Sequence, residues 1–237
     1  MKKLLIVSTS TVYGKPYLSY IEPEIIRFFS GCERILFIPY ARPGGITHAD
    51  YTAKANSVFS PLGFEMKGIH EWDNPKEALA WADGFFTGGG NTFVLLNELY
   101  QHGLVSSLRE AIESGKPYMG TSAGSNITGL SIQTTNDMPI VYPPSFNALQ
   151  LVPFNINPHY LDPIPDSKHM GETRETRIGE FHVYNNQPVV GIREGSALIL
   201  ENGELTLWGD HSARIFEQGK APYELKKSDS FNFLMNP

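Results

Sequence analysis

The alternation of short apolar runs with segments of helical spacing is the feature that most constrains the fold of this chain. Five short runs in the first half are largely apolar, without the strict alternation of a half-exposed strand. Such strands are typical of parallel sheets covered on both faces, joined by right-handed crossovers. We therefore predict an α/β fold with a mostly parallel sheet. The predicted strands span residues 3–7, 34–39, 64–69, 84–87 and 116–120, and the predicted helices span residues 17–29, 50–59, 75–81, 91–100 and 104–114.

The second half of the chain begins differently. Seven prolines fall between residues 131 and 168, and this spacing interrupts helices and predicts a long, semi-rigid loop region. Three apolar runs that predict further strands follow, at residues 188–192, 197–200 and 205–208. The pair Asn202-Gly203 predicts a tight hairpin between the last two. Because no linker rich in Gly, Ser or charge divides the chain, we expect one domain over residues 1–237.

Composition argues against several classes of partner and location. Cys32 is the only cysteine, so no intramolecular disulfide forms, which fits a reducing cytoplasm. The net charge is −6 and no dense block of Lys and Arg occurs, so we expect no nucleic-acid partner. No apolar run reaches the length of a membrane helix, and polar residues follow the first run at once. We therefore expect neither a membrane span nor a signal peptide, and a cytoplasmic location.

A candidate nucleophile follows the fifth predicted strand. Residues 120–124 read Gly-Thr-Ser-Ala-Gly, which matches the G-x-S-x-G nucleophile elbow. In such an elbow Ser122 lies in a strained turn from strand to helix, and small neighbours prevent clashes with both elements. The amide of Ala123 lies at the helix N-terminus, where it can face a developing oxyanion. A glycine-rich turn without catalytic function fits the same five letters, and the strand before them favours the elbow.

A second glycine-rich turn follows the fourth predicted strand. It reads Thr87-Gly-Gly-Gly-Asn91, and the carboxyl ends of parallel strands are where ligands bind. The glycines allow backbone N–H groups to approach a ligand, as a phosphate cradle or as the second half of an oxyanion hole. No Gly-Lys-Ser/Thr follows, which argues against a Walker-type phosphate site. A tight turn in which Asn91 caps the next helix is the structural alternative, and both interpretations are compatible.

A serine nucleophile needs a base. Of the seven histidines, His159 lies in the proline-rich region, where the backbone is stiff but exposed. His211 is the rival, because Asp210 precedes it. Adjacent residues rarely point together, so this proximity is weak evidence, and the residues alone leave both histidines open.

The base in turn needs an acid that orients it. Glu194 follows a predicted strand and is a candidate, as are Asp137 and Asp162. A solvated turn carboxylate is the structural alternative for Glu194. The stretch 171–178 looks like a helix N-terminus with charges three residues apart, a pattern that by itself is typical of a solvated, salt-bridged face.

Taken together, these motifs resemble the S51 family of serine peptidases, which includes cytoplasmic α-aspartyl dipeptidases. The resemblance covers nearly the whole chain. It rests on the order and spacing of Gly88-Gly-Gly-Asn-Thr-Phe93, Ser122-Ala-Gly-Ser-Asn126, Thr134-Thr-Asn-Asp-Met-Pro-Ile140, Ile156-Asn-Pro-His159 and Gly171-Glu-Thr-Arg-Glu175. It implies a three-layer α/β/α fold like that of class I glutamine amidotransferases, which is flavodoxin-like. It also implies hydrolysis of dipeptides with N-terminal aspartate through an acyl-enzyme.

The resemblance assigns roles to individual residues. It implies a triad of Ser122, His159 and Glu194, and so favours His159 over His211. It implies an oxyanion hole from Gly89, Gly90 and Ala123. It further implies that Arg174 pairs with the aspartyl carboxylate of the substrate and that Asn91 helps to orient it; the forked guanidinium of Arg suits a carboxylate.

Some features depart from the family pattern. Thr121 stands where a bulky aromatic residue is expected, Ser125 where alanine is expected, and the loop between His159 and Arg174 is a residue longer. These departures concern the shape of the substrate pocket rather than the triad. We expect no cofactor and no metal, because the chain lacks a zinc motif such as H-E-x-x-H. The expected partner is a small peptide with N-terminal aspartate, and a monomer and a homodimer both remain open.

Other functions fit parts of the pattern. A cyanophycinase-like aspartyl peptidase resembles this elbow, but its chains are usually longer and the Gly-Glu-Thr-Arg stretch favours the dipeptidase. A non-catalytic binding module on the same scaffold conflicts with the intact set Ser122, His159 and Glu194. A glutamine amidotransferase requires cysteine at the elbow. In an α/β-hydrolase esterase the acid precedes the histidine, whereas here the order is Ser, His, Glu.

Overall fold

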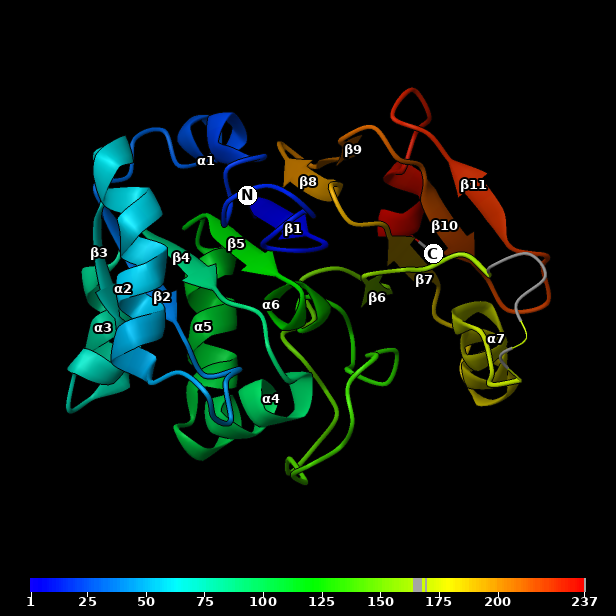
Figure 1. Cartoon of the computed structure of the whole chain (residues 1–237), viewed down its shortest axis with the longest axis horizontal. Helices are drawn as coiled ribbons and strands as arrows, with labels where there is room; N and C mark the ends of the chain where they lie inside the picture. Colours follow the sequence, from blue (N-terminus) through cyan, green and yellow to red (C-terminus); the bar gives the residue numbers. More distant parts are fainter. Residues whose placement is uncertain (164–167, 169, 237) are drawn as a thin grey trace.

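A computed structural model describes residues 1–163, 168 and 170–236. Its main element is a seven-stranded sheet in the order β3-β2-β4-β5-β1-β8-β9 (Figure 1). The first five of these strands are parallel, and β8 and β9 run antiparallel to their neighbours. The strands are β1 (Leu4–Val7), β2 (Arg34–Ile38), β3 (Glu65–Gly68), β4 (Gly84–Thr87), β5 (Tyr118–Thr121), β8 (Ala197–Glu201) and β9 (Glu204–Trp208).

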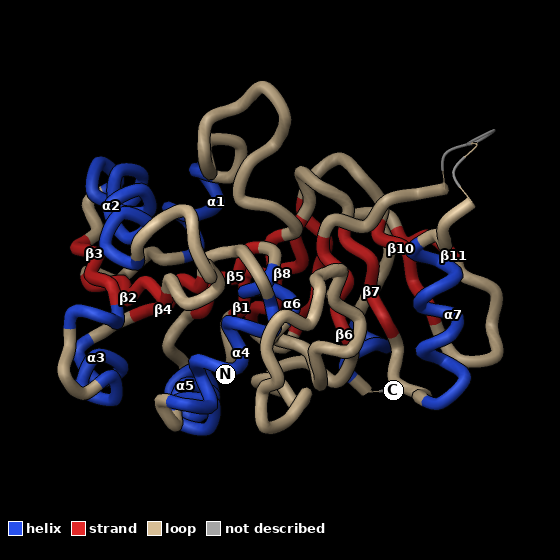
Figure 2. Tube along the Cα trace, turned by 60° about the horizontal axis from the view of Figure 1, so that its bottom comes forward, coloured by secondary structure: helices blue, strands red, loops and turns tan. Residues whose placement is uncertain are grey.

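Helices cover both faces of this sheet, because the strands are apolar on both sides. Leu5 and Val7 of β1 pack with one set of helices, and Leu4 and Ile6 with the other. Figure 2 shows α1 and α2 on one side of the strands and α3 and α5 on the other. The helices are α1 (Glu22–Phe28), α2 (His48–Phe59), α3 (Pro75–Trp81), α4 (Thr92–Gln101), α5 (Leu104–Glu113), α6 (Ala123–Asn126) and α7 (Arg174–Tyr184), with 3-10 turns at Ser60–Leu62, Ile69–Glu71 and Asn232–Met235. The predicted three-layer α/β/α arrangement is confirmed.

A second sheet of four strands lies at one end of the first (Figures 1 and 2). Its order is β11-β10-β7-β6, and α7 packs on it through Ile178. Its strands are β6 (Asn155–Pro158), β7 (Val189–Ile192), β10 (Ala213–Phe216) and β11 (Tyr223–Leu225). One apolar cluster contains side chains of both sheets, Leu4 and Ile6 beside Ile156 and Val190.

Two predicted elements were wrong in extent. The predicted helix 17–29 begins only at Glu22, because Pro23 fits the first turn of a helix but not its interior. The predicted loop region 131–168 contains the strand β6, which ends at Pro158. Proline is tolerated there because β6 is an edge strand. Residues 164–167 of that region lie outside the described residues.

The hairpin prediction is confirmed. The predicted hairpin joins β8 to β9, and both Asn202 and Gly203 have positive φ, as its tight turn requires. Among the described residues, no helix is both long and apolar enough to cross a membrane.

Candidate active site

Ser122 lies on a strained turn between β5 and α6. Its backbone has φ 54° and ψ −112°, a conformation that residues with a Cβ atom rarely adopt. The flanking glycines are required by space. A Cβ atom at Gly120 would lie 2.3 Å from the Gly124 carbonyl oxygen, and one at Gly124 would lie 2.3 Å from the Thr87 carbonyl oxygen. The motif therefore forms the sharp elbow that the sequence predicted.

Ser125, the residue that departs from the expected alanine, is tied into this elbow. Its hydroxyl is fully buried and lies 2.6 Å from the Val7 carbonyl oxygen and 2.7 Å from that of Gly120. Its single proton bonds one of these acceptors at a time or is shared between them. Ser125 thus links the elbow to the ends of β1 and β5, beneath the nucleophile rather than in front of it.

His159 lies between Ser122 and Glu194. Its Nε2 is 2.9 Å from Ser122 Oγ, and its Nδ1 is 2.7 Å from Glu194 Oε1. With the proton on Nδ1, the imidazole donates to the carboxylate and leaves Nε2 to accept the serine hydroxyl. His159 follows β6 and Glu194 follows β7, which are paired in parallel. The structure therefore brings together three predicted residues that are 37 and 35 positions apart in sequence.

The backbone of His159 is itself held in an unusual conformation. Its φ is 52°, in the left-handed region. The His159 amide donates to Ser8 Oγ at 2.9 Å, and the Ser8 hydroxyl donates to the Ile192 carbonyl at 2.8 Å. Ser8 is fully buried at the end of β1. It therefore fixes the histidine against both sheets, a function that the sequence reasoning missed.

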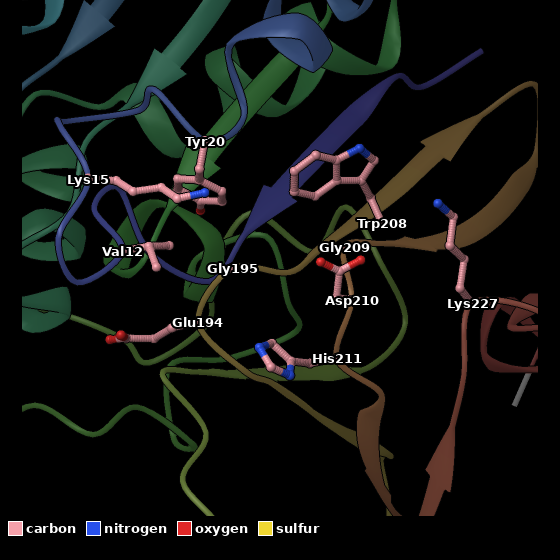
Figure 3. A pocket seen from close by; sticks show the side chains of 10 residues that line it. All are labelled: Val12, Lys15, Tyr20, Glu194, Gly195, Trp208, Gly209, Asp210, His211 and Lys227. Atoms are coloured by element: carbon pink, nitrogen blue, oxygen red, sulfur yellow. The ribbon is translucent and has the colours of Figure 1, made fainter.

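The rival candidates lie elsewhere. His211 projects into a cavity of about 420 Å³ that it shares with Glu194, but in Figure 3 the Glu194 side chain points away from it. Asp162 is ion-paired with Arg193 at 2.6 Å. Asp137 accepts hydrogen bonds from the start of α4. In the part of the chain that the structure describes, neither aspartate contacts His159.

The turn Gly88–Gly90 runs beside the serine. A Cβ atom at Gly89 would lie 2.9 Å from Ser122 Cβ, and one at Gly90 would lie 2.2 Å from the Ala41 carbonyl oxygen. Among the described residues, the amides of Gly89, Gly90 and Ala123 donate no hydrogen bond to protein atoms. Free amides next to a serine hydroxyl are what an oxyanion hole requires.

Asn91 is the N-cap of α4. Its Oδ1 accepts a hydrogen bond from the Val94 amide at 3.1 Å, and its Nδ2 donates to the Met138 carbonyl at 2.9 Å. The structural interpretation of this residue is therefore confirmed. Its predicted contact with substrate stays a prediction, and one proton of Nδ2 remains available for it.

Arg174 is the first residue of α7, after the N-cap Thr173. It is half-buried and lines a small cavity of about 40 Å³ together with Arg177, Asn136 and Asn157. Burial lowers the pKa of the Arg174 guanidinium, the like charge of Arg177 lowers it further, and Asp137 acts in the opposite direction. At a reference value above 12 the group stays charged near neutral pH, and a bound anion relieves both unfavourable effects.

No cluster of three or more His, Cys, Asp or Glu side chains within the described ranges is arranged to hold a metal ion. The site consists instead of a strained serine bonded to a histidine, which is bonded to a glutamate. On an α/β scaffold, with free amides beside the serine, this is the arrangement of a serine-type hydrolase.

Comparison with known proteins gives the family. A sequence model of peptidase family S51 matches residues 4–208, and the chain belongs to this family. Peptidase E of Streptomyces coelicolor is 46% identical over 233 residues, covering 98% of this chain and 95% of that protein. A probable alpha-aspartyl dipeptidase of Drosophila melanogaster is 43% identical over 237 residues, covering 99% and 98%.

Solved structures show the same fold. A putative peptidase E from Listeria monocytogenes superimposes with a TM-score of 0.66 and 25% identity, covering 89% of this chain and all of that one. A peptidase from an acI-B1 actinobacterium superimposes with a TM-score of 0.72 and 20% identity, covering 98% and 96%. The chain is thus a serine-type peptidase of family S51, as the sequence predicted.

Proposed function

We propose that this protein is a serine dipeptidase that hydrolyses dipeptides with N-terminal aspartate. The observation that carries the proposal is the hydrogen-bonded chain from Ser122 through His159 to Glu194. The half-buried Arg174 supports the preference for an acidic first residue. The relatives named peptidase E and probable alpha-aspartyl dipeptidase, which match almost the whole chain, support the same substrate class.

The reaction proceeds in two halves. Ser122 Oγ attacks the carbonyl carbon of the aspartyl residue while His159 Nε2 takes its proton. The oxyanion receives hydrogen bonds from the amides of Gly89 or Gly90 and of Ala123, each worth about 3–4 kcal/mol in transition-state stabilisation. The C–N bond breaks as His159 returns the proton to the leaving amine. Water, deprotonated by His159, then hydrolyses the acyl-enzyme, releases aspartate and restores the serine.

Glu194 acts on the histidine rather than on the substrate. Its carboxylate accepts the Nδ1 proton, which keeps Nε2 free as the base and stabilises the imidazolium during each half-reaction. No step requires a cofactor. The single cysteine is consistent with a reducing cytoplasm, where we propose that the enzyme acts.

The test is turnover of a dipeptide panel, Asp-Leu, Glu-Leu, Asn-Leu and Ala-Leu, by the purified protein. We expect efficient hydrolysis of Asp-Leu, and a loss of about 10⁴-fold or more in Ser122→Ala with unchanged thermal unfolding. Turnover retained in Ser122→Ala would contradict the nucleophile, and equal rates across the panel would contradict the substrate class.

Arg174→Ala separates substrate recognition from chemistry in the same panel. It should lower kcat/KM for Asp-Leu by about 100-fold and affect Ala-Leu little. Lys220→Ala is the control, because this cation is 63% exposed, pairs with Glu217 and does not line the cavity that contains Arg174. Equal effects of Arg174→Ala on both substrates would show that Arg174 does not bind the aspartyl side chain.

A further inference from the structure

The turn Gly88–Gly90 is held at both ends by backbone hydrogen bonds. The amide of its first glycine donates to the Ile38 carbonyl at 3.2 Å, and the amide that follows the turn donates to the Ala41 carbonyl at 2.7 Å. The peptide between Gly89 and Gly90 lies inside the turn and has no backbone partner among the described residues. Its orientation therefore depends on a side chain.

Tyr51 of α2 provides that side chain. Its hydroxyl donates to the Gly89 carbonyl at 3.1 Å, and the residue is only 1% exposed. The ring meets Phe37 edge to face, with centroids 5.0 Å apart, and the Arg42 guanidinium lies 5.2 Å from its centroid. A Cβ atom at Gly88 would lie 2.4 Å from the Tyr51 oxygen, so the phenol is fixed in contact with the turn.

The Tyr51 hydroxyl keeps its proton near neutral pH. Burial raises the pKa of this phenol, although the charge of Arg42 and the hydrogen bonds of the hydroxyl act in the opposite direction. A neutral phenol has one proton to donate, and the Gly89 carbonyl receives it. The hydrogen bond is therefore present at the pH values where His159 can act as a base.

A peptide plane that is fixed at its oxygen is also fixed at its hydrogen. The peptide between Gly89 and Gly90 is trans, so its carbonyl and its N–H point in opposite directions. Tyr51 belongs to the apolar cluster on one face of the larger sheet, and Ala123 belongs to the cluster on the other face. Because the Gly89 carbonyl is directed at Tyr51, the Gly90 N–H is directed toward the face where the Ala123 amide begins α6.

Without the Tyr51 hydroxyl, this peptide plane would be free to rotate. Glycine on both sides removes the Cβ contacts that hinder such a rotation, and Gly90 has φ 151°, which glycine adopts at no steric cost. A half-turn of the plane would place the Gly89 carbonyl oxygen where the Gly90 N–H had been. A carbonyl oxygen repels a developing oxyanion, so the turned peptide would destabilise the transition state.

We propose that Tyr51 is a positioning residue, whose hydroxyl holds the Gly89–Gly90 peptide with the Gly90 N–H in the oxyanion hole. The phenol acts through the glycine turn and not on the substrate. This inference rests on the proposed dipeptidase function and identifies which of the two glycine amides is the donor. A purely structural role of Tyr51, in the packing of α2 on the sheet, is the alternative that the experiment separates.

The experiment measures kcat and KM for Asp-Leu in wild type and in Tyr51→Phe, which removes the hydroxyl and keeps the ring. An interaction made only in the transition state affects kcat and leaves KM unchanged. Loss of a whole oxyanion donor costs about 10²–10³-fold in kcat. Because the Gly90 amide itself remains, we expect kcat to fall about 10- to 100-fold, with KM changed less than about twofold. An unchanged kcat would overturn the proposal.

Two inhibitors give a second readout. The boronic acid analogue of aspartate forms a tetrahedral adduct with Ser122 and places an oxygen in the oxyanion position. β-Alanine has the amine and the side-chain carboxylate of aspartate but no group in that position. Tyr51→Phe should weaken binding of the boronic acid by about the factor that it lowers kcat, and it should leave binding of β-alanine unchanged. Equal weakening of both inhibitors would indicate a general distortion of the site and overturn the proposal.

Tyr100→Phe is the matched control. The Tyr100 hydroxyl also donates to a backbone carbonyl, that of Asn147 at 2.8 Å, and it lies at the end of α4 opposite the glycine turn. This variant should keep the wild-type kcat, KM and inhibitor binding. A Tyr51→Phe protein that unfolds at a lower temperature but keeps its kcat would show that Tyr51 supports packing alone.

The outcomes also separate this inference from the function on which it rests. If wild-type protein fails to hydrolyse Asp-Leu, the proposed function falls and this inference with it. If wild-type protein hydrolyses Asp-Leu and Tyr51→Phe does so with the same kcat, only the inference falls.

Discussion

At the scale of single residues, the geometry of the site depends on glycines that leave no room for a Cβ atom. The elbow and the neighbouring turn come so close that any side chain at Gly124 collides with the backbone of Thr87. An added Cβ atom would meet backbone atoms of Thr87, so the clash cannot be relieved by a rotamer change. The identity of this residue therefore follows from space and not from chemistry.

Gly124→Ala tests this close approach. We expect it to destabilise the protein by about 1–3 kcal/mol, as overpacking in a rigid interior does, and to lower kcat by displacing Ser122. Gly179→Ala in α7 is the matched control, since a Cβ atom there meets nothing within 4 Å. It should stabilise the helix by roughly 0.5–1 kcal/mol. Urea unfolding measures both, and equal stability of the two variants would contradict the close contact.

At the scale of elements, β2 and β4 are joined where they begin by an ion pair. Asp83 accepts from the backbone and guanidinium of Arg34, 2.8 Å away at its closest, and this pair lowers the pKa of the Asp83 carboxyl to about 2. The ordinary value of this group is near 3.8. The folded state therefore binds the proton more weakly than the unfolded state does.

The lowered pKa of Asp83 determines how its contribution to stability changes with pH. The stabilisation from Asp83 is complete above about pH 4 and is lost as the pH falls toward 2. Asp83→Asn should therefore be less stable than wild type at pH 6, and the difference should shrink at pH 3. Urea midpoints of the two proteins at both pH values check this. A difference of the same size at both pH values would contradict the assignment.

The helices and strands that the local sequence determines were predictable, whereas those that depend on tertiary contacts were not. The segment that forms β4 is a short apolar run, and α3 begins with the N-cap Asn74 followed by Pro75, so the local sequence specifies both. The strand β6 has two asparagines and a proline, and it is a strand only because β7 lies beside it. The polar segment around Asp137 was visible as a motif, but its position between the glycine turn and His159 depends on contacts far apart in sequence.

The site itself was predictable only in part for the same reason. The elbow at Ser122 is a local motif and could be read directly. His159 and Glu194 were chosen from several histidines and acids through family resemblance, and their separation in sequence gives no geometric signal. Ser8 was missed because a serine after a strand is common. Its role depends on Ile192 and His159, which only the folded chain brings near.

At the scale of the whole molecule, the site lies where the two sheets meet. Ser122 belongs to the larger sheet, while His159 and Glu194 follow strands of the smaller one. Ser8 joins the two through its hydrogen bonds. The relative position of the sheets therefore sets the distance between nucleophile and base. A small shift of one sheet against the other would lower the rate of the reaction.

Ser8→Ala should lower kcat by about 10-fold, because His159 loses one restraint, with little change in KM. The cost in stability should be about 1–2 kcal/mol, since the His159 amide loses its acceptor. Ser57→Ala, at an exposed serine of α2, is the control and should change neither. A Ser8→Ala enzyme that loses stability but keeps its kcat would show that Ser8 supports the fold alone.

The positive φ angles of Ser122 and His159 have a consequence for how this sequence can change over time. Glycine adopts such backbone conformations without steric cost, so at both positions the residue that best suits the backbone is one that cannot perform the chemistry. Selection for stability and selection for activity therefore oppose each other at two residues of the same site. A lineage freed from the need for catalysis would relieve this backbone strain by replacing both residues with glycine.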